Sequence, residues 1–320
     1  MKTMALGGSV VSSRIAYGCM PLGGSWDHSP IAPANVTKAV KAVRAAIDSG
    51  INFYDHADIY CRGKSETIFS QVLSELKHRR DTLILQSKVG IMFAGDPAPT
   101  SPQRFDFSYD HIISSIEKTL KRLQTDYLDI YLLHRPDSLV EPMEVAKAFD
   151  ELHRAGKVRH FGVSNHNREH IELLKRYLNQ PILVNQVEVS LVHTHLFDAG
   201  VVTNQGKTSY GADGTLDYCR LNNITIQAWG PVASGRAVGG TDSPRSIELA
   251  RVVGEIASKK GVSKEAIAVA WLLRHPAKIQ PIIGSTDPAR ISAICHADKV
   301  ELNREEWYTL YTAGRGERLP

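Results

Sequence analysis

The feature of this sequence that most limits its fold is a regular alternation of short apolar runs with longer segments of helical spacing. Between the runs, apolar residues recur at helical intervals, as in Ile112, Ile116 and Leu120. One helix between two strands returns the chain to the same edge of a sheet, so we expect the strands to pair in parallel. The predicted strands span residues 14–18, 51–55, 83–89, 127–134, 158–164, 182–188, 224–229 and 279–284.

Eight strand–helix units along one chain favour a closed (β/α)8 barrel, a TIM barrel, of the α/β class. No stretch rich in Pro, Gly or Ser divides the chain into halves, so residues 1–320 are predicted to form a single domain. The alternative, an open doubly wound sheet, commonly carries a G-x-G-x-x-G turn after its first strand, and this sequence contains none.

A barrel fold predicts a role for three further segments. The run "MALGGSVVSS" (residues 4–13) reads as an N-terminal β-hairpin that closes the amino-terminal end of the barrel. Residues 94–106 and 230–245 are long connections that follow the carboxyl ends of strands. Active sites of such barrels lie at that end, so we expect these two connections to act as lids.

Composition excludes several classes of protein. The net charge is only +4 over 320 residues, and the longest basic run is "KHRR" (residues 77–80), which argues against nucleic-acid binding. No apolar run is long enough to cross a membrane or to serve as a signal peptide. The four cysteines are widely separated, which is typical of reduced thiols, so we expect a cytoplasmic protein without a disulfide framework.

Polar side chains gather where the predicted strands end. In a barrel these ends meet at one rim, where catalytic residues cluster, whereas structural polar residues would be scattered. A lysine inside an apolar strand is rarely buried unless it is paired, and Asp55 on the neighbouring strand is the available partner of Lys88. The residues at the strand ends are Asp55, Tyr60, Lys88, His134, Ser164, Asn165, Asn185, Gln186 and Trp229.

These segments also resemble a known family. "NFYDHADIYCRGKSE", "SKVG", "DIYLLHRPD", "GKVRHFGVSNH", "NQVEVS", "QAWGPVASG" and "PIIGSTDPAR" occur in the order and at the separations found in aldo-keto reductases. The similarity covers nearly the whole chain, and "DHADIY" is most similar to the bacterial branch of the family. It implies a (β/α)8 barrel and NAD(P)H-dependent reduction of aldehydes or ketones. His56 stands where the family commonly has threonine, and we expect it in the pocket wall.

The resemblance implies a catalytic tetrad of Asp55, Tyr60, Lys88 and His134. Hydride transfer to a carbonyl carbon leaves an alkoxide that needs a proton, and Tyr60 is the neutral acid of the set. We expect the ammonium of Lys88 to lower the pKa of Tyr60, and Asp55 to hold Lys88 charged and in place. His134 is expected to orient and polarise the carbonyl oxygen.

The resemblance also implies the cofactor site. The nicotinamide carboxamide is expected at Ser164, Asn165 and Gln186, with the ring stacked on Trp229. Arg290 is placed to reach a 2′-phosphate, which favours NADPH over NADH. The remaining expected contacts are Pro231, Ser234 and Gly235 at the pyrophosphate, and Gly284, Ser285 and Thr286 at the adenosine end.

The substrate is expected to be a compact aldehyde or ketone, and the family default is a monomer. The candidates for an aromatic pocket near the rim are Trp26, Phe93, Phe105 and Phe107. Two other functions remain open. One is metal-assisted hydrolysis or isomerisation, for which His193 and His195 supply an H-x-H pair but no acidic partner at a recognisable spacing, so no metal is expected. The other is a cofactor-binding regulatory or sensor subunit with little turnover.

Overall fold

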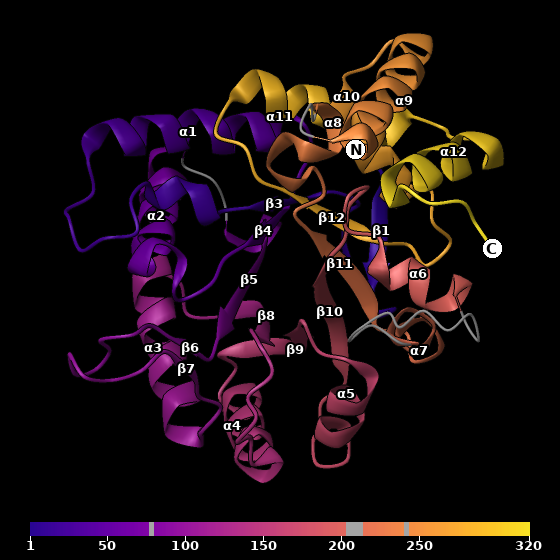
Figure 1. Cartoon of the computed structure of the whole chain (residues 1–320). Helices are drawn as coiled ribbons and strands as arrows, with labels where there is room; N and C mark the ends of the chain where they lie inside the picture. The colour runs from indigo at the N-terminus through magenta and orange to yellow at the C-terminus, as the bar shows by residue number, and fades with distance from the viewer. Residues whose placement is uncertain (77–79, 203–213, 240–242) are drawn as a thin grey trace.

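The protein was analysed as a computed structural model that describes residues 1–76, 80–202, 214–239 and 243–320, so most of the basic run at 77–80 lies outside the described residues. In this described part, eight parallel strands close into a barrel at the centre of the molecule (Figure 1). Each predicted strand forms one of them, which confirms the (β/α)8 barrel. In barrel order they are β3 (Ala16–Gly18), β4 (Phe53–Asp55), β5 (Ile84–Val89), β8 (Leu128–Leu133), β9 (Val158–Ser164), β10 (Ile182–Glu188), β11 (Thr225–Trp229) and β12 (Gln280–Ile283).

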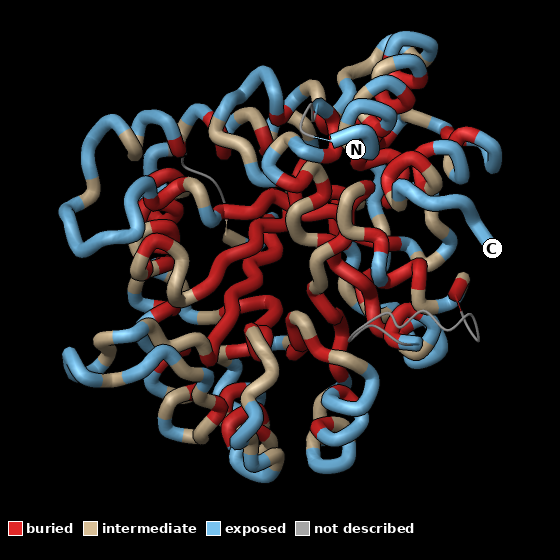
Figure 2. Tube along the Cα trace, viewed as in Figure 1, coloured by how far each residue is buried: buried red, intermediate tan, exposed pale blue. Residues whose placement is uncertain are grey.

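Helices surround the barrel and turn their apolar faces toward it, leaving exposed residues on the outside (Figure 2). In α3 the predicted stripe of Ile112, Ile116 and Leu120 is buried, and α4 begins at Pro142, where a first turn accepts proline. The α-helices are α1 (Pro33–Asp48), α2 (Lys64–Leu76), α3 (Tyr109–Leu123), α4 (Pro142–Arg154), α5 (Arg168–Lys175), α6 (His195–Val201), α7 (Thr215–Leu221), α8 (Arg236–Gly239), α9 (Pro244–Lys260), α10 (Lys264–Leu273), α11 (Pro288–Cys295) and α12 (Arg304–Arg315). The 3-10 helices are η1 (Met20–Gly23), η2 (Tyr60–Gly63), η3 (Arg80–Thr82), η4 (Ala233–Gly235) and η5 (His296–Lys299).

An N-terminal hairpin covers the amino-terminal end of the barrel, as the sequence predicts. Strands β1 (Thr3–Leu6) and β2 (Val10–Ser13) pair antiparallel. Leu6 is fully buried in a small inner core with Phe53 and Ile84, which begin β4 and β5. The amide of Gly7 donates to Thr225 Oγ1 at 2.9 Å, which ties the turn to the start of β11.

Strand alternation separates two cores and sets the position of the site. Phe53 of β4 and Ile84 of β5 point into the barrel. Along a strand every second side chain points the same way, so Asp55, two positions after Phe53, and Lys88, four positions after Ile84, share this direction. Asp55 and Lys88 therefore project into the barrel near its carboxyl-terminal rim. Tyr54, on the opposite face of β4, belongs to the larger core between barrel and helices.

The two predicted lids have regular structure. The first, residues 94–106, includes β7 (Arg104–Phe105), which forms an antiparallel hairpin with β6 (Ile91–Met92) beyond β5. The segment 230–245 contains η4 and α8 and the start of α9, while residues 240–242 lie outside the described residues. Their role as lids stays a prediction.

Two other findings concern the whole chain. Among the described helices none is both long and apolar enough to cross a membrane. The four cysteines are free and buried.

Candidate active site

The ammonium of Lys88 lies at the centre of the site. Its Nζ donates to Asp55 Oδ2 at 2.8 Å, to the carbonyl oxygen of His56 at 2.8 Å and to the hydroxyl of Tyr60 at 2.9 Å. Lys88 is fully buried, and an ammonium has three hydrogens to donate. Its position is therefore fixed by three partners, two of which are the expected Asp55 and Tyr60.

A strained turn presents Tyr60 to this lysine. Tyr60 begins η2, and the next two residues, Cys61 and Arg62, have φ angles of 48° and 57°, which side chains rarely adopt. The turn is held from outside, because Cys61 Sγ lies 3.4 Å from the carbonyl oxygen of Met20 and Arg62 Nε donates to that of Trp26 at 3.0 Å. Strain of this kind persists only where surrounding contacts determine the conformation.

His134 stands on the other side of Tyr60. It follows β8, and its ring lies edge-to-face with that of Tyr60, with the centroids 6.0 Å apart. Burial, with added repulsion from Lys88 and Arg135, lowers the pKa of His134 well below its usual value. The ring is therefore a neutral imidazole at neutral pH, and its Nδ1 has no hydrogen-bond partner among the described residues.

The ionisation of Tyr60 differs from the prediction. Burial raises the pKa of Tyr60 above its ordinary value, and Lys88 opposes this change without offsetting it. The expected net lowering is wrong, because desolvation of the phenolate exceeds the attraction of an ammonium that Asp55 already neutralises. For Lys88 burial acts to lower the pKa, but Asp55 and Tyr60 outweigh it and the pKa is raised. The resting pair is thus a neutral phenol beside a charged lysine.

A layer of buried glutamines lies beneath the tetrad, and the sequence analysis missed most of it. Gln86 Nε2 donates to Asp55 Oδ1 at 2.6 Å and Gln186 Nε2 donates to the same oxygen at 2.9 Å. Both amides also donate to Gln227 Oε1. The side-chain oxygen Oε1 of Gln86 has no partner among the described residues. The only signal in the sequence is that Gln86 precedes Lys88 by two positions and so shares its face.

This layer continues down to the hairpin. Gln227 Nε2 donates to Gln280 Oε1 at 2.9 Å, and Gln280 Nε2 donates to Ser12 Oγ at 3.0 Å and to the carbonyl oxygen of Ser13 at 2.9 Å. Hydrogen bonds thus run without a break from the N-terminal hairpin through the barrel to the carboxylate of Asp55.

The residues expected around a nicotinamide meet at the rim beside His134. Asn165, with a φ angle of 61°, donates from Nδ2 to the carbonyl oxygen of His134 and to Ser164 Oγ. Its Oδ1 accepts from Trp229 Nε1 at 3.1 Å. Gln186 differs, since it is turned into the glutamine layer. A hydroxyl and amides next to an indole face suit a neutral ring that carries a carboxamide.

The remaining expected cofactor residues follow two neighbouring strands. Pro231, Ser234 and Gly235 come after β11, and Gly284, Ser285 and Thr286 come after β12, which pairs with β11. Thr286 lies just before Asp287, the N-cap of α11. Arg290, in the first turn of α11, is half-exposed and donates to Glu265 Oε1 at 3.3 Å. A helix amino terminus with hydroxyls and an arginine nearby suits a phosphate group.

His56 does not lie in the pocket wall, so that prediction is wrong. Its side chain is fully buried and packs edge-to-face on Phe69 of α2, with centroids 4.6 Å apart. Asp55 points into the barrel, and the next side chain points out toward the helices. Burial and then Lys88 lower the pKa of His56 to about 3, so the ring is neutral.

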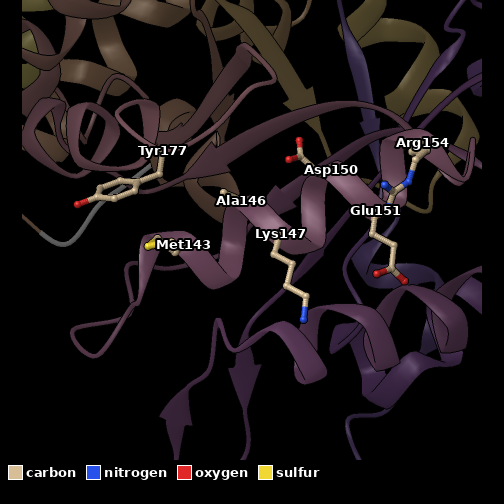
Figure 3. A pocket seen from close by; sticks show the side chains of 7 residues that line it. All are labelled: Met143, Ala146, Lys147, Asp150, Glu151, Arg154 and Tyr177. Atoms are coloured by element: carbon tan, nitrogen blue, oxygen red, sulfur yellow. The ribbon is translucent and has the colours of Figure 1, made fainter.

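Two other features, a surface depression and a pair of histidines, involve none of the predicted catalytic or cofactor residues. A depression of about 430 Å³ lies on the outer face of α4 and contains none of the predicted site residues (Figure 3). His193 and His195 lie with their ring centroids 4.9 Å apart. In the described part of the chain no group of three or more His, Cys, Asp or Glu side chains is arranged to hold a metal ion.

Comparison with known proteins assigns the family. The aldo/keto reductase family model matches residues 14–313, which confirms the resemblance seen in the motifs. The 6-dehydroglucose reductase of Novosphingobium aromaticivorans is 36% identical over 288 residues, covering 88% of this chain and 87% of that protein. The uncharacterized oxidoreductase YcsN of Bacillus subtilis is 34% identical over 324 residues, covering 100% of both.

Solved structures agree with the sequence comparison. The structure of an aldo-keto reductase from Klebsiella pneumoniae in complex with NADPH matches with a TM-score of 0.74 and 26% identity, over 97% of this chain and 93% of that one. Because the family model spans nearly the whole chain and relatives above 30% identity cover most of it, this protein belongs to the aldo/keto reductase family of oxidoreductases.

Proposed function

We propose that this protein reduces an aldehyde or ketone to the alcohol, with NADPH as the hydride donor. The observation that carries the proposal is the position of Lys88 Nζ, 2.8 Å from Asp55 Oδ2 and 2.9 Å from the Tyr60 hydroxyl. This arrangement suits proton donation to a nascent alkoxide. The relatives support it, since one is named a reductase of 6-dehydroglucose and a structural neighbour was solved with NADPH.

Each residue of the tetrad has its own role in proton transfer. When bound, NADPH supplies the hydride that forms the new C–H bond. The O–H bond of Tyr60 breaks as its proton passes to the carbonyl oxygen, and the Lys88 ammonium stabilises the phenolate that remains. His134, a neutral imidazole, donates an N–H to the same oxygen and so holds the carbonyl in line. Asp55 keeps Lys88 charged throughout.

The choice of NADPH over NADH rests on Arg290. Its guanidinium is half-exposed at the start of α11, and Glu265 orients it. The 2′-phosphate of NADPH carries more negative charge than the single carboxylate of Glu265. Arg290 can therefore bind the phosphate while it keeps its contact with Glu265. Ser285 and Thr286 add hydroxyls beside it. We further propose that residues 1–320 act as one domain, as a cytoplasmic monomer, on a small molecule and without nucleic acid.

The test uses the purified protein with NADPH and a panel that includes 4-nitrobenzaldehyde and methylglyoxal, followed at the nicotinamide absorbance. Tyr60→Phe should lower kcat by about 10²- to 10⁴-fold, because only the general acid is lost. Tyr131→Phe is the matched control, since its buried hydroxyl has no hydrogen-bond partner among the described residues, and it should keep full activity. Tight NADPH binding with no turnover of any carbonyl would instead support a sensor subunit.

A further inference from the structure

Arg135 differs from three other cations near the catalytic residues because it has no acidic partner in the described part of the chain. Lys88 pairs with Asp55 at 2.8 Å, and Arg62 pairs with Asp96 at 3.3 Å. Lys64, which follows η2, pairs with Asp27 at 3.2 Å. Among the residues that the structure describes, no carboxylate lies within ion-pair distance of Arg135, and only an aromatic ring contacts its guanidinium.

The position of this guanidinium places it at the mouth of the site. Arg135 directly follows His134, and its charge contributes to the lowered pKa of that histidine. Its Cζ lies 5.8 Å from the centroid of the Trp229 ring. The side chain is partly buried, so it has lost part of its hydration without gaining a counter-charge from the protein.

The part of the rim beside Tyr60 is apolar. The ring of Trp26 lies edge-to-face with Tyr60, with centroids 6.5 Å apart, and Phe93 packs against Trp26 at 6.3 Å. The guanidinium of Arg62 already has partners there, since its Cζ lies 4.6 Å from the centroid of the Phe93 ring and it forms an ion pair with Asp96. A substrate that reaches Tyr60 therefore meets apolar rings beside Tyr60 and, next to His134, a guanidinium that pairs with no carboxylate of the described residues.

We propose that Arg135 binds a carboxylate on the carbonyl substrate, so that the preferred substrates are oxo acids. This inference rests on the proposed function and names its substrate class. A guanidinium presents two parallel N–H groups that match the two oxygens of a carboxylate, and the partly dehydrated mouth strengthens such a pair.

The experiment compares 4-formylbenzoate with its methyl ester, two aldehydes of similar shape that differ in charge, in the full-length enzyme with NADPH. Arg135→Gln should lower kcat/KM for the acid by about 10- to 100-fold, since a hydrogen-bonded charge pair is lost. The ester should change by less than about threefold. Arg135→Lys should restore part of the loss, because it keeps the charge and loses the bidentate geometry.

Arg159→Gln controls for net charge, since Arg159 lies near the start of β9 at the far end of the barrel and is 55% exposed. It should leave the ratio of acid to ester unchanged. Equal losses for acid and ester in Arg135→Gln would overturn the proposal. So would weaker NADPH binding by this variant, which would assign Arg135 to the cofactor instead.

A binding measurement separates this inference from the proposed function. Calorimetry with 4-formylbenzoate, on Tyr60→Phe with and without Arg135→Gln, needs no turnover. An affinity that falls by about tenfold or more on loss of Arg135 supports the anion site even if the enzyme reduces no aldehyde. An unchanged affinity rejects the site even if carbonyl reduction is demonstrated.

Discussion

At the scale of single residues, the balance between burial and nearby charges sets the protonation of Lys88 and Tyr60 in the tetrad. Lys88 keeps its proton because Asp55 and Tyr60 outweigh its desolvation. Tyr60 keeps its proton as well, because desolvation of a phenolate outweighs the pull of Lys88. A general acid must carry its proton before it can give it away, so a raised pKa suits the reductive direction.

This ionisation predicts the pH dependence of the two directions. Reduction needs the protonated phenol, so kcat should fall only as the pH rises past a pKa that lies above the ordinary value of 10.0. Alcohol oxidation needs the phenolate and should rise over the same range. Steady-state kinetics in both directions, with circular dichroism to confirm folding at high pH, checks this. A fall in reduction centred near neutral pH would show that Lys88 prevails over burial.

At the scale of elements, two residues that are two positions apart in a strand lie on the same face of the sheet. Gln86 and Lys88 of β5 both point into the barrel, and both contact Asp55 of β4, Gln86 at Oδ1 and Lys88 at Oδ2. One strand thus supplies both an amide and an ammonium to the same carboxylate. The amides of Gln86 and Gln186 orient the oxygen that Lys88 does not use.

The glutamine layer should therefore affect catalysis through Asp55. Gln86→Met keeps the volume but removes two donated hydrogen bonds, and we expect kcat to fall by about tenfold with little change in KM. Gln280→Met, at the hairpin end of the layer, serves as the matched control and should lower stability while kcat remains. Measured kcat, KM and urea unfolding for both variants test this. Equal effects on kcat would show that the layer is only structural.

At the scale of the whole molecule, the hairpin and the active site occupy opposite ends of one barrel. The inner core of Leu6, Phe53 and Ile84 closes the amino-terminal end, and the tetrad lies near the other rim. The glutamine layer stands between them. Stability and catalysis should thus be separable by the end of the barrel at which a residue is changed.

Leu6→Ala tests this separation. Removal of a fully buried leucine side chain should lower the free energy of unfolding by about 2–5 kcal/mol, because a cavity replaces its contacts. The kcat should stay within about twofold of the wild-type value. Val11→Ala, on the other strand of the hairpin and 63% exposed, should cost less than about 0.5 kcal/mol. Urea unfolding and steady-state kinetics provide both readouts, and a large loss of kcat in Leu6→Ala would contradict the separation.

Sequence pattern alone was enough to predict the eight strands, the hairpin and the pairing of Asp55 with Lys88, and the family resemblance added Tyr60 to that pair. Strands and helices follow from the spacing of apolar residues, which is local, and strand ends converge in any parallel barrel. The net direction of the Tyr60 pKa shift, the burial of His56 and the hydrogen bond of Gln186 to Asp55 became visible only in the folded chain. Each of these depends on desolvation and on partners from distant strands, and neither quantity is encoded in local spacing. The lone guanidinium of Arg135 belongs with them, because a missing partner is visible only when every neighbour is in place.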